Sequence, residues 1–301
     1  MTHVFEGVLP AITTPFNDDM TVDHAYLARH AAWMIDQGCR GVIPLGSLGE
    51  SATLEFHEKV EIVRTLVDAL GNRAPVIPGV AALSTAQGVA LARAARDAGC
   101  RGLMILPPYV YASDWREMKA HVSAIIGATD LPVILYNNPI AYGTDFLPEQ
   151  ILELVREHAN VRGVKESSGD ARRVTALRAL LPADVSVLVG LDDMLVEGVR
   201  SGAAGWVAGL VNAFPAESVQ LFDLACSDRT AEADALYRWF LPLLRLDTEV
   251  KFVQLIKFVQ EEVGRGSARV RAPRLELTPA DQERVRGLLV QAFGAPHPVP
   301  A

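Results

Sequence analysis

The sequence predicts an α/β protein, a (β/α)8 TIM barrel with a C-terminal helical appendage. Through the first three quarters of the chain, short β-branched apolar runs alternate with longer amphipathic stretches. The runs are apolar on both faces, which is typical of parallel strands that are covered by helices. A chain of 301 residues also has a length at which single α/β barrels are common.

Eight runs are predicted to be strands, and a pattern of apolar residues three and four positions apart follows each of them. Eight such units favour a closed barrel over an open sheet. No GxGxxG motif follows the first strand, which removes the usual sign of a dinucleotide-binding open sheet. The predicted strands are residues 7–14, 41–46, 75–82, 102–108, 132–137, 161–167, 185–190 and 205–210. Several helices begin with a plausible N-cap, namely Asp23, Ser84 and Ser113.

The strand pattern stops near residue 226. We therefore predict a catalytic barrel over residues 1–225 and a helical extension over residues 226–301. The segment WFLPLLRL is apolar enough to pack on the barrel or on another subunit. Helical patterns in the extension cover residues 230–246, 248–264 and 279–293.

The composition argues against several classes of partner. The formal charge is −8 and the chain has no basic cluster, so neither nucleic acid nor an anionic membrane surface is an expected partner. The first residues lack the pattern of a secretory signal, and the longest uncharged stretch, residues 201–216, is broken by glycine, proline and polar residues. A cytoplasmic protein is expected. The three cysteines have no CxxC or metal-finger spacing and are expected to be buried free thiols.

Lys165, in the stretch GVKESSGD, lies at the carboxyl end of the sixth predicted strand, where barrels carry their catalytic groups. Side chains alternate along a strand, so Lys165 and Ser167 share one face while Glu166 points to the other. If Lys165 faces the barrel interior, desolvation lowers the pKa of its ammonium, and a neutral amine can form a Schiff base with a carbonyl. An outward-facing or salt-bridged lysine is the alternative, and the position alone does not decide between them.

Two further candidates lie at strand ends. Tyr136 ends the neighbouring strand, and its phenol, linked to the Ser47 hydroxyl, could carry protons to and from an enamine. A rim aromatic with a satisfied hydroxyl is the structural alternative. The stretch GSLGE, residues 46–50, offers backbone amides and a hydroxyl to a carboxylate, although most such segments are simply tight turns.

Two observations disfavour other chemistry. None of the seven histidines ends a predicted strand, so a metal site of the His-based barrel type is not expected. The loop after the seventh strand carries Asp192 and Asp193, whose charge would repel a substrate phosphate.

The motifs GSLGE, YNNP and GVKESSGD, in this order and with a helical tail, resemble the class I Schiff-base-forming family of dihydrodipicolinate synthase and N-acetylneuraminate lyase. The resemblance covers nearly the whole chain. It implies Lys165 as the imine-forming lysine, Tyr136 as the proton-transferring phenol and Ser47 as the hydroxyl of a proton relay. It also implies that the amides of Ser47 and Leu48 receive the carboxylate of a 2-oxo acid, and that the protein is a homotetramer, a dimer of dimers. Further residues expected around the substrate are Ala141, Ser167, Gly190 and Val207.

Departures from the family pattern bear on the substrate. The synthase branch typically has an arginine that holds a substrate carboxylate where this sequence has Ala141. That branch also has a second tyrosine, contributed across a subunit interface, where this sequence has Val110, with Tyr111 shifted by one residue. Leu48 replaces a second hydroxyl with an apolar wall. With these features the sequence is most similar to the branch that contains 1-pyrroline-4-hydroxy-2-carboxylate deaminase of hydroxyproline breakdown.

The implied reaction converts this cyclic imine to 2,5-dioxopentanoate and ammonia, with no metal or dissociable cofactor. Other functions remain open. They are dihydrodipicolinate synthase, a non-catalytic 2-oxo acid sensor, and a 2-keto-3-deoxy sugar acid aldolase or dehydratase with Tyr142, Thr144, Ser167 and Asn212 as polar contacts.

Overall fold

The computed structural model describes residues 5–109, 111, 113–294 and 297–299. Within this part of the chain the strands are β1 (Gly7–Pro10), β2 (Gly79–Val80), β3 (Leu103–Ile105), β4 (Val133–Asn137), β5 (Val161–Glu166), β6 (Ser186–Val189) and β7 (Gly205–Ala208). They form one sheet in the order β1-β7-β6-β5-β4-β3-β2, and every neighbouring pair is parallel. The parallel order follows from the βα alternation that the sequence predicts.

Residues 41–46, all of them described, close the barrel through isolated parallel bridges rather than as a regular strand. Val42 bridges Val76, and Ile43 bridges Ala11. The pairing stays short because proline has no N–H to donate, and prolines recur where these segments meet: Pro10, Pro44, Pro75 and Pro78. The fold is thus the predicted TIM barrel, with one bridged segment among its regular strands.

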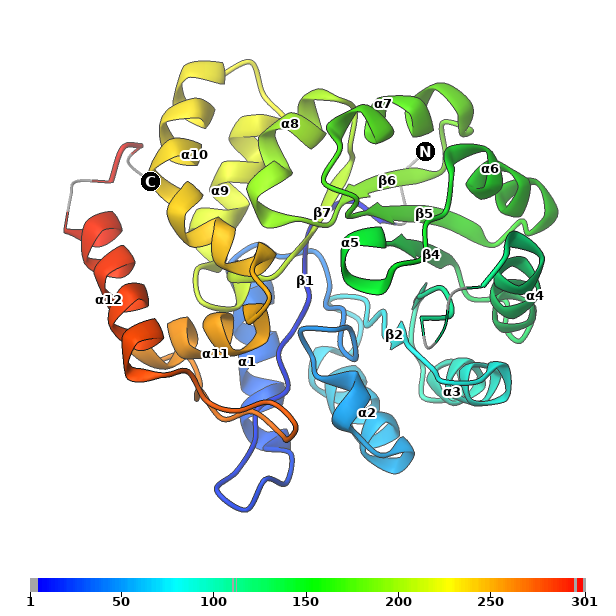
Figure 1. Cartoon of the computed structure of the whole chain (residues 1–301), viewed down its shortest axis with the longest axis horizontal. Helices are drawn as coiled ribbons and strands as arrows, with labels where there is room; N and C mark the ends of the chain where they lie inside the picture. The colour runs from blue at the N-terminus through cyan, green and yellow to red at the C-terminus, as the bar shows by residue number, and fades with distance from the viewer. Residues whose placement is uncertain (1–4, 110, 112, 295–296, 300–301) are drawn as a thin grey trace.

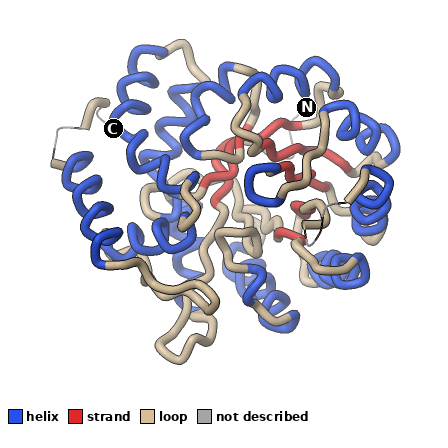
Figure 2. The backbone as a smooth tube through the Cα atoms, viewed as in Figure 1, coloured by secondary structure: helices blue, strands red, loops and turns tan. Residues whose placement is uncertain are grey.

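Helices cover the outside of the sheet, as Figures 1 and 2 show. They are α1 (His24–Asp36), α2 (Phe56–Leu70), α3 (Thr85–Asp97), α4 (Trp115–Ile126), α5 (Pro139–Tyr142), α6 (Pro148–Glu157), α7 (Ala171–Leu180), α8 (Leu195–Arg200) and α9 (Pro215–Ala225). Short 3-10 turns η1 (Ser51–Thr53), η2 (Asp192–Met194) and η3 (Leu210–Asn212) lie in loops that follow strand segments.

Two of the predicted N-caps are confirmed, because Asp23 caps α1 and Ser84 caps α3. The prediction of Ser113 was wrong. The next residue, Asp114, caps α4 by accepting a hydrogen bond from the Glu117 N–H at 2.9 Å. A carboxylate at this position also interacts favourably with the positive end of the helix dipole.

The barrel interior is filled at its amino end and hollow at its carboxyl end. Phe5, which precedes β1, fills the amino end and packs against Gly163. A Cβ at Gly163 would lie 2.9 Å from the Phe5 ring, so a larger residue would clash with it. A second, larger apolar layer lies between the strands and the helices. The interior cluster consists of Phe5, Leu9, Ile43, Ile77, Met104, Leu106, Ile134, Tyr136, Leu188 and Val207.

The C-terminal appendage consists of α10 (Thr230–Leu244), the 3-10 turn η4 (Arg245–Thr248), α11 (Phe252–Glu262) and α12 (Pro279–Phe293). Figure 1 shows its helices together along one side of the barrel. The helix predicted over residues 248–264 begins only at Phe252, because the chain first makes the η4 turn. Within that turn the Thr248 hydroxyl donates to the Arg245 carbonyl at 2.9 Å, which satisfies the end of the helix locally.

The apolar segment at residues 239–246 packs within this chain, since Phe240, Leu243, Leu244 and Leu246 are fully buried. The predicted boundary at residue 226 directly follows α9, and the division into two domains stays a prediction.

No described helix is long and apolar enough to cross a membrane. Cys39 and Cys100 are buried as expected. The prediction was wrong for Cys226, which is exposed because it caps the end of α9 at the surface.

Candidate active site

A cavity of about 460 Å³ lies at the carboxyl ends of the strands, a volume suited to a small molecule. The barrel provides one part of its lining and the C-terminal appendage provides the other. Of the residues that the sequence predicts for the site, the lining contains Ser47, Leu48, Tyr136, Ala141, Lys165, Gly190 and Val207, and it also contains Tyr142, predicted as a contact for a sugar acid. From the appendage it contains Asp247, Thr248, Glu249, Val250, Phe252 and Arg274.

Lys165 faces the barrel interior, so of the two orientations that the sequence left open the inward one is present. It is 6% exposed, and its Nζ lies 4.0 Å from the centroid of the Tyr136 ring. Burial lowers the pKa of the Lys165 ammonium to about 8, although the carboxylates of Asp247 and Asp192 act in the opposite direction. The cavity therefore holds an amine that is partly neutral near physiological pH.

Glu166 lies on the opposite face of β5 and does not pair with Lys165. Its carboxylate accepts hydrogen bonds from Asn137 Nδ2 at 3.2 Å and from the Ser168 N–H at 2.7 Å, and Arg173 Nε lies 3.4 Å away. The prediction that Lys165 and Glu166 do not pair is therefore confirmed. The pair is separated because successive side chains of a strand point in opposite directions.

The phenol of Tyr136 is held by Asn138, which follows it by two residues. Asn138 Nδ2 donates to Tyr136 Oη at 2.9 Å, while Asn138 Oδ1 accepts from the Ala141 N–H at 3.0 Å and so caps α5. Burial raises the pKa of Tyr136 to about 12. Asn138 thus ties the phenol of β4 to the helix that follows it, a role that was missed although the motif YNNP contains it.

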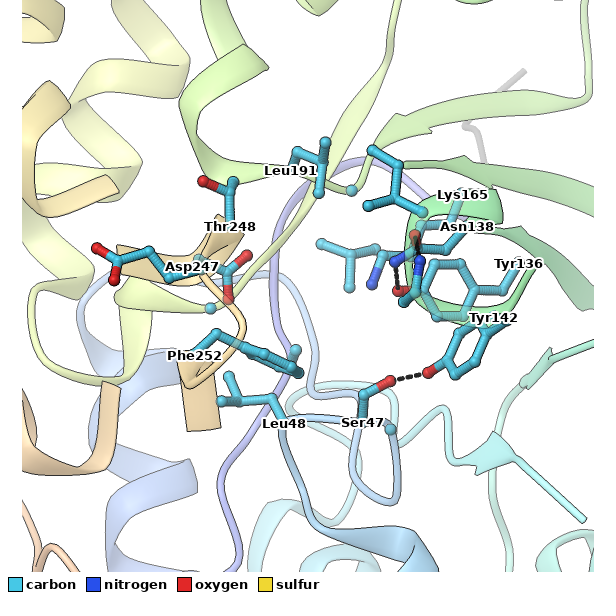
Figure 3. A pocket seen from close by; sticks show the side chains of 18 of the residues that line it. Ser47, Leu48, Tyr136, Asn138, Tyr142, Lys165, Leu191, Asp247, Thr248 and Phe252 are labelled. Atoms are coloured by element: carbon cyan, nitrogen blue, oxygen red, sulfur yellow. Dashed lines mark hydrogen bonds between the residues drawn. The ribbon is translucent and has the colours of Figure 1, made fainter. Parts of the chain in front are cut away.

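Ser47 lies beside a second tyrosine in addition to the predicted Tyr136. Its hydroxyl is hydrogen-bonded to Tyr142 Oη at the end of α5, as Figure 3 shows. The Tyr142 ring meets the Tyr136 ring edge-on at 5.9 Å between centroids. Burial raises the pKa of Tyr142 as well. The predicted link between Ser47 and Tyr136 is also present, because hydrogen bonding by Ser47 is among the effects that act against the burial that raises the pKa of Tyr136. The site thus contains an array of two phenols and one hydroxyl.

Three residues of the turn GSLGE, namely Gly46, Ser47 and Leu48, line the cavity. Leu45 and Glu50, at its two ends, have left-handed backbones with φ of 62° and 54°, an arrangement that costs energy and is common at functional sites. The Thr14 hydroxyl holds the turn by donating to the Gly49 carbonyl at 2.7 Å. Among the described residues, neither the Ser47 N–H nor the Leu48 N–H donates to another protein group.

A buried ion pair joins this turn to the C-terminal appendage. Lys257 Nζ of α11 donates to Glu50 Oε1 at 2.8 Å and to the Thr14 carbonyl at 2.9 Å. The other Glu50 oxygen accepts from the Arg271 N–H at 3.0 Å. The side chains of Lys257 and Glu50 are 1% and 0% exposed, so this contact is desolvated on both sides. The appendage is therefore anchored at the mouth of the cavity.

Asp247 enters the cavity from η4, a contribution that the sequence analysis missed. Its carboxylate lies over the Cα of Gly209, where a Cβ would come within 2.0 Å of Asp247 Oδ1. Burial, and after it the charge of Asp192, raises the pKa of Asp247 well above its usual range. The predicted helices, residues 230–246 and 248–264, left Asp247 in their connection, but a helical pattern does not tell where such a connection lies on the barrel.

Asp192, whose charge acts on Asp247, is held in place by hydrogen bonds from its surroundings. It is fully buried, and its carboxylate accepts hydrogen bonds from Trp206 Nε1 at 3.0 Å, the Gly209 N–H at 3.0 Å and the Leu210 N–H at 2.7 Å. Burial raises the pKa of Asp192 to about 6, and these donors act against that shift.

Several other predicted residues lie away from the described lining of the cavity. The Ser167 hydroxyl is buried behind Gly190, and the side chains of Thr144 and Asn212 are buried too. Asn212 Nδ2 donates hydrogen bonds to the Ala11 and Gly209 carbonyls at 2.9 and 2.8 Å. Tyr111 is 57% exposed, and Val110 lies outside the described residues.

The described residues include no group of three or more His, Cys, Asp or Glu side chains placed to hold a metal ion.

Gly190→Ala should destabilise the protein and displace Lys165. A Cβ at Gly190 would lie 1.9 Å from Ser167 Oγ and 2.7 Å from Lys165 Cε. We expect the free energy of unfolding in urea to fall by about 1–3 kcal/mol, the usual cost of overpacking. Gly287→Ala is the matched control, because nothing lies within 4 Å of a Cβ at that exposed position of α12. Equal stability of the two variants would contradict the prediction.

The chain is similar to known proteins both in sequence and in structure. Residues 4–292 match the model of the dihydrodipicolinate synthetase family. A 4-hydroxy-tetrahydrodipicolinate synthase of Methanoculleus marisnigri is 33% identical over 95% of this chain and 99% of its own length. The structure of a synthase of the same name from Methylacidiphilum fumariolicum SolV superimposes with a TM-score of 0.92 at 30% identity, covering 96% of each chain. YagE of E. coli K12, solved in complex with pyruvate, has a TM-score of 0.91 at 25% identity, covering 96% of this chain and 99% of its own.

Proposed function

Because the chain belongs to the dihydrodipicolinate synthetase family, a family of class I Schiff-base lyases, we propose that it converts 1-pyrroline-4-hydroxy-2-carboxylate to 2,5-dioxopentanoate and ammonia. The observation that carries this proposal is the buried Lys165 amine, with its lowered pKa, at the inner end of a largely apolar cavity. A neutral amine in such a place is a nucleophile for the C2 carbon of a cyclic imine.

The first half of the proposed reaction opens the ring. Lys165 Nζ attacks C2, the C2–N bond of the ring breaks, and the ring nitrogen leaves as a primary amine while an enzyme imine forms. The free amides of Ser47 and Leu48 bind the carboxylate on C2. Tyr136 moves protons at the imine nitrogen and at C3, and the Ser47–Tyr142 pair extends this route.

The second half releases water and ammonia. Loss of a C3 proton gives an enamine, whose electron pair expels the hydroxyl from C4 as water. Proton transfer from C5 then converts the primary amine to a C5 imine. Hydrolysis of this imine and of the enzyme imine consumes two waters and releases ammonia, 2,5-dioxopentanoate and free Lys165. One water is consumed overall, and the protonated imine is the only electron sink that the sequence of steps requires.

The walls of the cavity support a small substrate with few hydroxyls. Apolar side chains surround most of it, and Ala141 leaves no guanidinium beside α5. Thr144 and Asn212, which a polyhydroxylated sugar acid would use, lie outside the described lining. The apolar side chains that line the cavity include Leu48, Ile140, Leu191, Val207 and Phe252.

Arg274 favours a second candidate, 4-hydroxy-tetrahydrodipicolinate synthase. Its side chain lines the cavity from the loop before α12 and is 26% exposed, with Nη1 3.8 Å from Glu50 Oε2. A guanidinium from this direction could hold a second substrate carboxylate in place of the arginine that Ala141 lacks. The names of the relatives agree with this candidate.

We further propose that the protein works in the cytoplasm as a homotetramer. The hydrogen bond between Ser47 and Tyr142 lies within one chain, so the second phenol of the relay does not have to come from a partner subunit. Light scattering during gel filtration would measure the assembly.

A substrate panel separates the candidate functions. Ammonia release is measured with the pyrroline acid, pyruvate formation with 2-keto-3-deoxy sugar acids, and condensation with pyruvate plus aspartate semialdehyde. Ammonia release from the pyrroline acid alone is the expected result. Condensation without ammonia release would overturn the deaminase in favour of the synthase, and binding without any turnover would favour a 2-oxo acid sensor.

Imine formation should depend on pH through Lys165. Only the neutral amine attacks, and the pKa of Lys165 is about 8. The rate of imine formation with pyruvate should therefore rise about tenfold per pH unit below that pKa and level off above it. Quenching with borohydride at successive times gives the rate. A rise that continues to about pH 10 would indicate an ordinary lysine and contradict the prediction.

A further inference from the structure

We propose that Asp247 is the general acid that delivers a proton to the C4 hydroxyl of the substrate as that hydroxyl leaves. The inference rests on the proposed function only in assuming that the compound bound to Lys165 carries a hydroxyl two carbons beyond the imine carbon. It assigns a step of the reaction to the C-terminal appendage, which otherwise closes the side of the cavity.

The geometry places Asp247 across the cavity from the lysine. Figure 3 shows Asp247 and Thr248 on one wall, with Lys165 and Tyr136 on the facing wall. The two walls stand over neighbouring strands: Lys165 Cε covers Gly190 at the end of β6, and the Asp247 carboxylate covers Gly209 at the end of β7. A substrate joined to Lys165 at C2 therefore extends its C4 and C5 atoms toward Asp247.

Two other polar side chains of that wall are engaged elsewhere. Glu249 is held by Arg284 through two hydrogen bonds of 2.9 and 2.8 Å. The Thr248 hydroxyl donates to the Arg245 carbonyl at 2.9 Å. Asp247 is thus the acid on this side of the cavity that is placed to act on the substrate.

The surroundings of Asp247 favour the protonated form of its carboxyl. Burial and the charges of Asp192 and Asp193 raise its pKa, while Lys165 on β5 acts in the opposite direction. Asp192 accepts several N–H donors, which stabilise its carboxylate as the anion. Two neighbouring carboxyls in unequal environments divide the roles of acid and anion, a pattern typical of acid–base catalysis.

The step balances in atoms and electrons. The enamine pair at C3 forms the C3–C4 double bond, the C4–O bond breaks, and the proton of Asp247 joins the departing oxygen to give water. The Asp247 carboxylate then takes a proton from C5, whose electron pair enters the conjugated imine. Asp247 is protonated again at the end, so no further acid is needed.

Asp247→Asn tests the proposal, because asparagine resembles the neutral acid in shape but delivers no proton. Borohydride with pyruvate should still label Lys165 to within about twofold of the unmodified enzyme. Ammonia release should fall by about 100-fold or more, the range that general acid catalysis contributes. Borohydride quenching during turnover should trap an adduct that keeps its C4 oxygen, measured by mass spectrometry of the labelled peptide.

Asp234→Asn is the matched control. It makes the same replacement in the same C-terminal appendage, and Asp234 lies outside the described lining of the cavity, where it accepts a hydrogen bond from Arg200 Nη2 at 2.7 Å. Ammonia release in this control should stay within about threefold of the unmodified enzyme, whereas a loss as large as that of Asp247→Asn would show a general effect of the replacement and overturn the proposal.

The proposal for Asp247 is also overturned if Asp247→Asn turns over at a near-normal rate, or if this variant no longer forms the pyruvate adduct. If the unmodified enzyme releases no ammonia but consumes a C4-hydroxy sugar acid, the proposed function fails and the same two variants test Asp247 on that acid. An enzyme that consumes neither overturns both.

Discussion

Lys165→Arg should abolish both turnover and the borohydride-stable adduct. Arginine keeps the positive charge and much of the length, but its guanidinium does not form an imine. The catalysed rate should fall by about 10⁴-fold or more, as expected when a covalent nucleophile is removed. Ammonia release measures the rate, and intact mass after treatment with pyruvate and borohydride measures the adduct.

The second buried lysine provides an internal control for this experiment. Lys257 is as buried as Lys165, but it is held by Glu50 and by the Thr14 carbonyl. Peptide mapping should therefore find the adduct at Lys165 and not at Lys257. An adduct at Lys257, or turnover that survives in Lys165→Arg, would contradict the Schiff-base mechanism.

Glu50→Gln should lower the free energy of unfolding by about 3 kcal/mol, because it leaves the ammonium of Lys257 buried without its counter-charge. The Glu50 carboxylate accepts from the Lys257 ammonium and from the Arg271 backbone N–H. A glutamine has only one side-chain oxygen, so its NH2 group would face one of these two donors and leave it without an acceptor. Urea denaturation, extrapolated to water, measures the loss.

A surface pair serves as the matched control for this variant. Lys251 donates to Asp281 at 2.7 Å, but its side chain is 49% exposed. Lys251→Met should therefore cost less than about 1 kcal/mol, since exposed ion pairs contribute little. If Glu50→Gln costs no more than Lys251→Met, the buried pair does not anchor the appendage.

Much of the fold could be predicted from the sequence, because it depends on local periodicity. Apolar runs bounded by helical patterns identify the strands, and alternation along residues 161–167 separates Lys165 from Glu166 without any coordinates. The conformation of residues 41–46 was harder to predict, because a sequence pattern identifies an apolar run but not how many N–H donors its neighbouring segments offer. Prolines on the adjoining segments decide that the run makes bridges instead of a regular strand.

The candidate site divides along the same line. By itself the sequence determined the TIM barrel, the strand end that carries Lys165, and the turn at residues 46–50, because each depends on residues close together in the chain. Only the tertiary structure decided that Ser47 also pairs with Tyr142, and that η4 brings Asp247 over Gly209. Such contacts join residues far apart in sequence, and their partners depend on how helices pack across the barrel mouth. A helical pattern in the sequence does not determine that packing. The wall of the cavity that contains Asp247 could therefore not be predicted from the sequence.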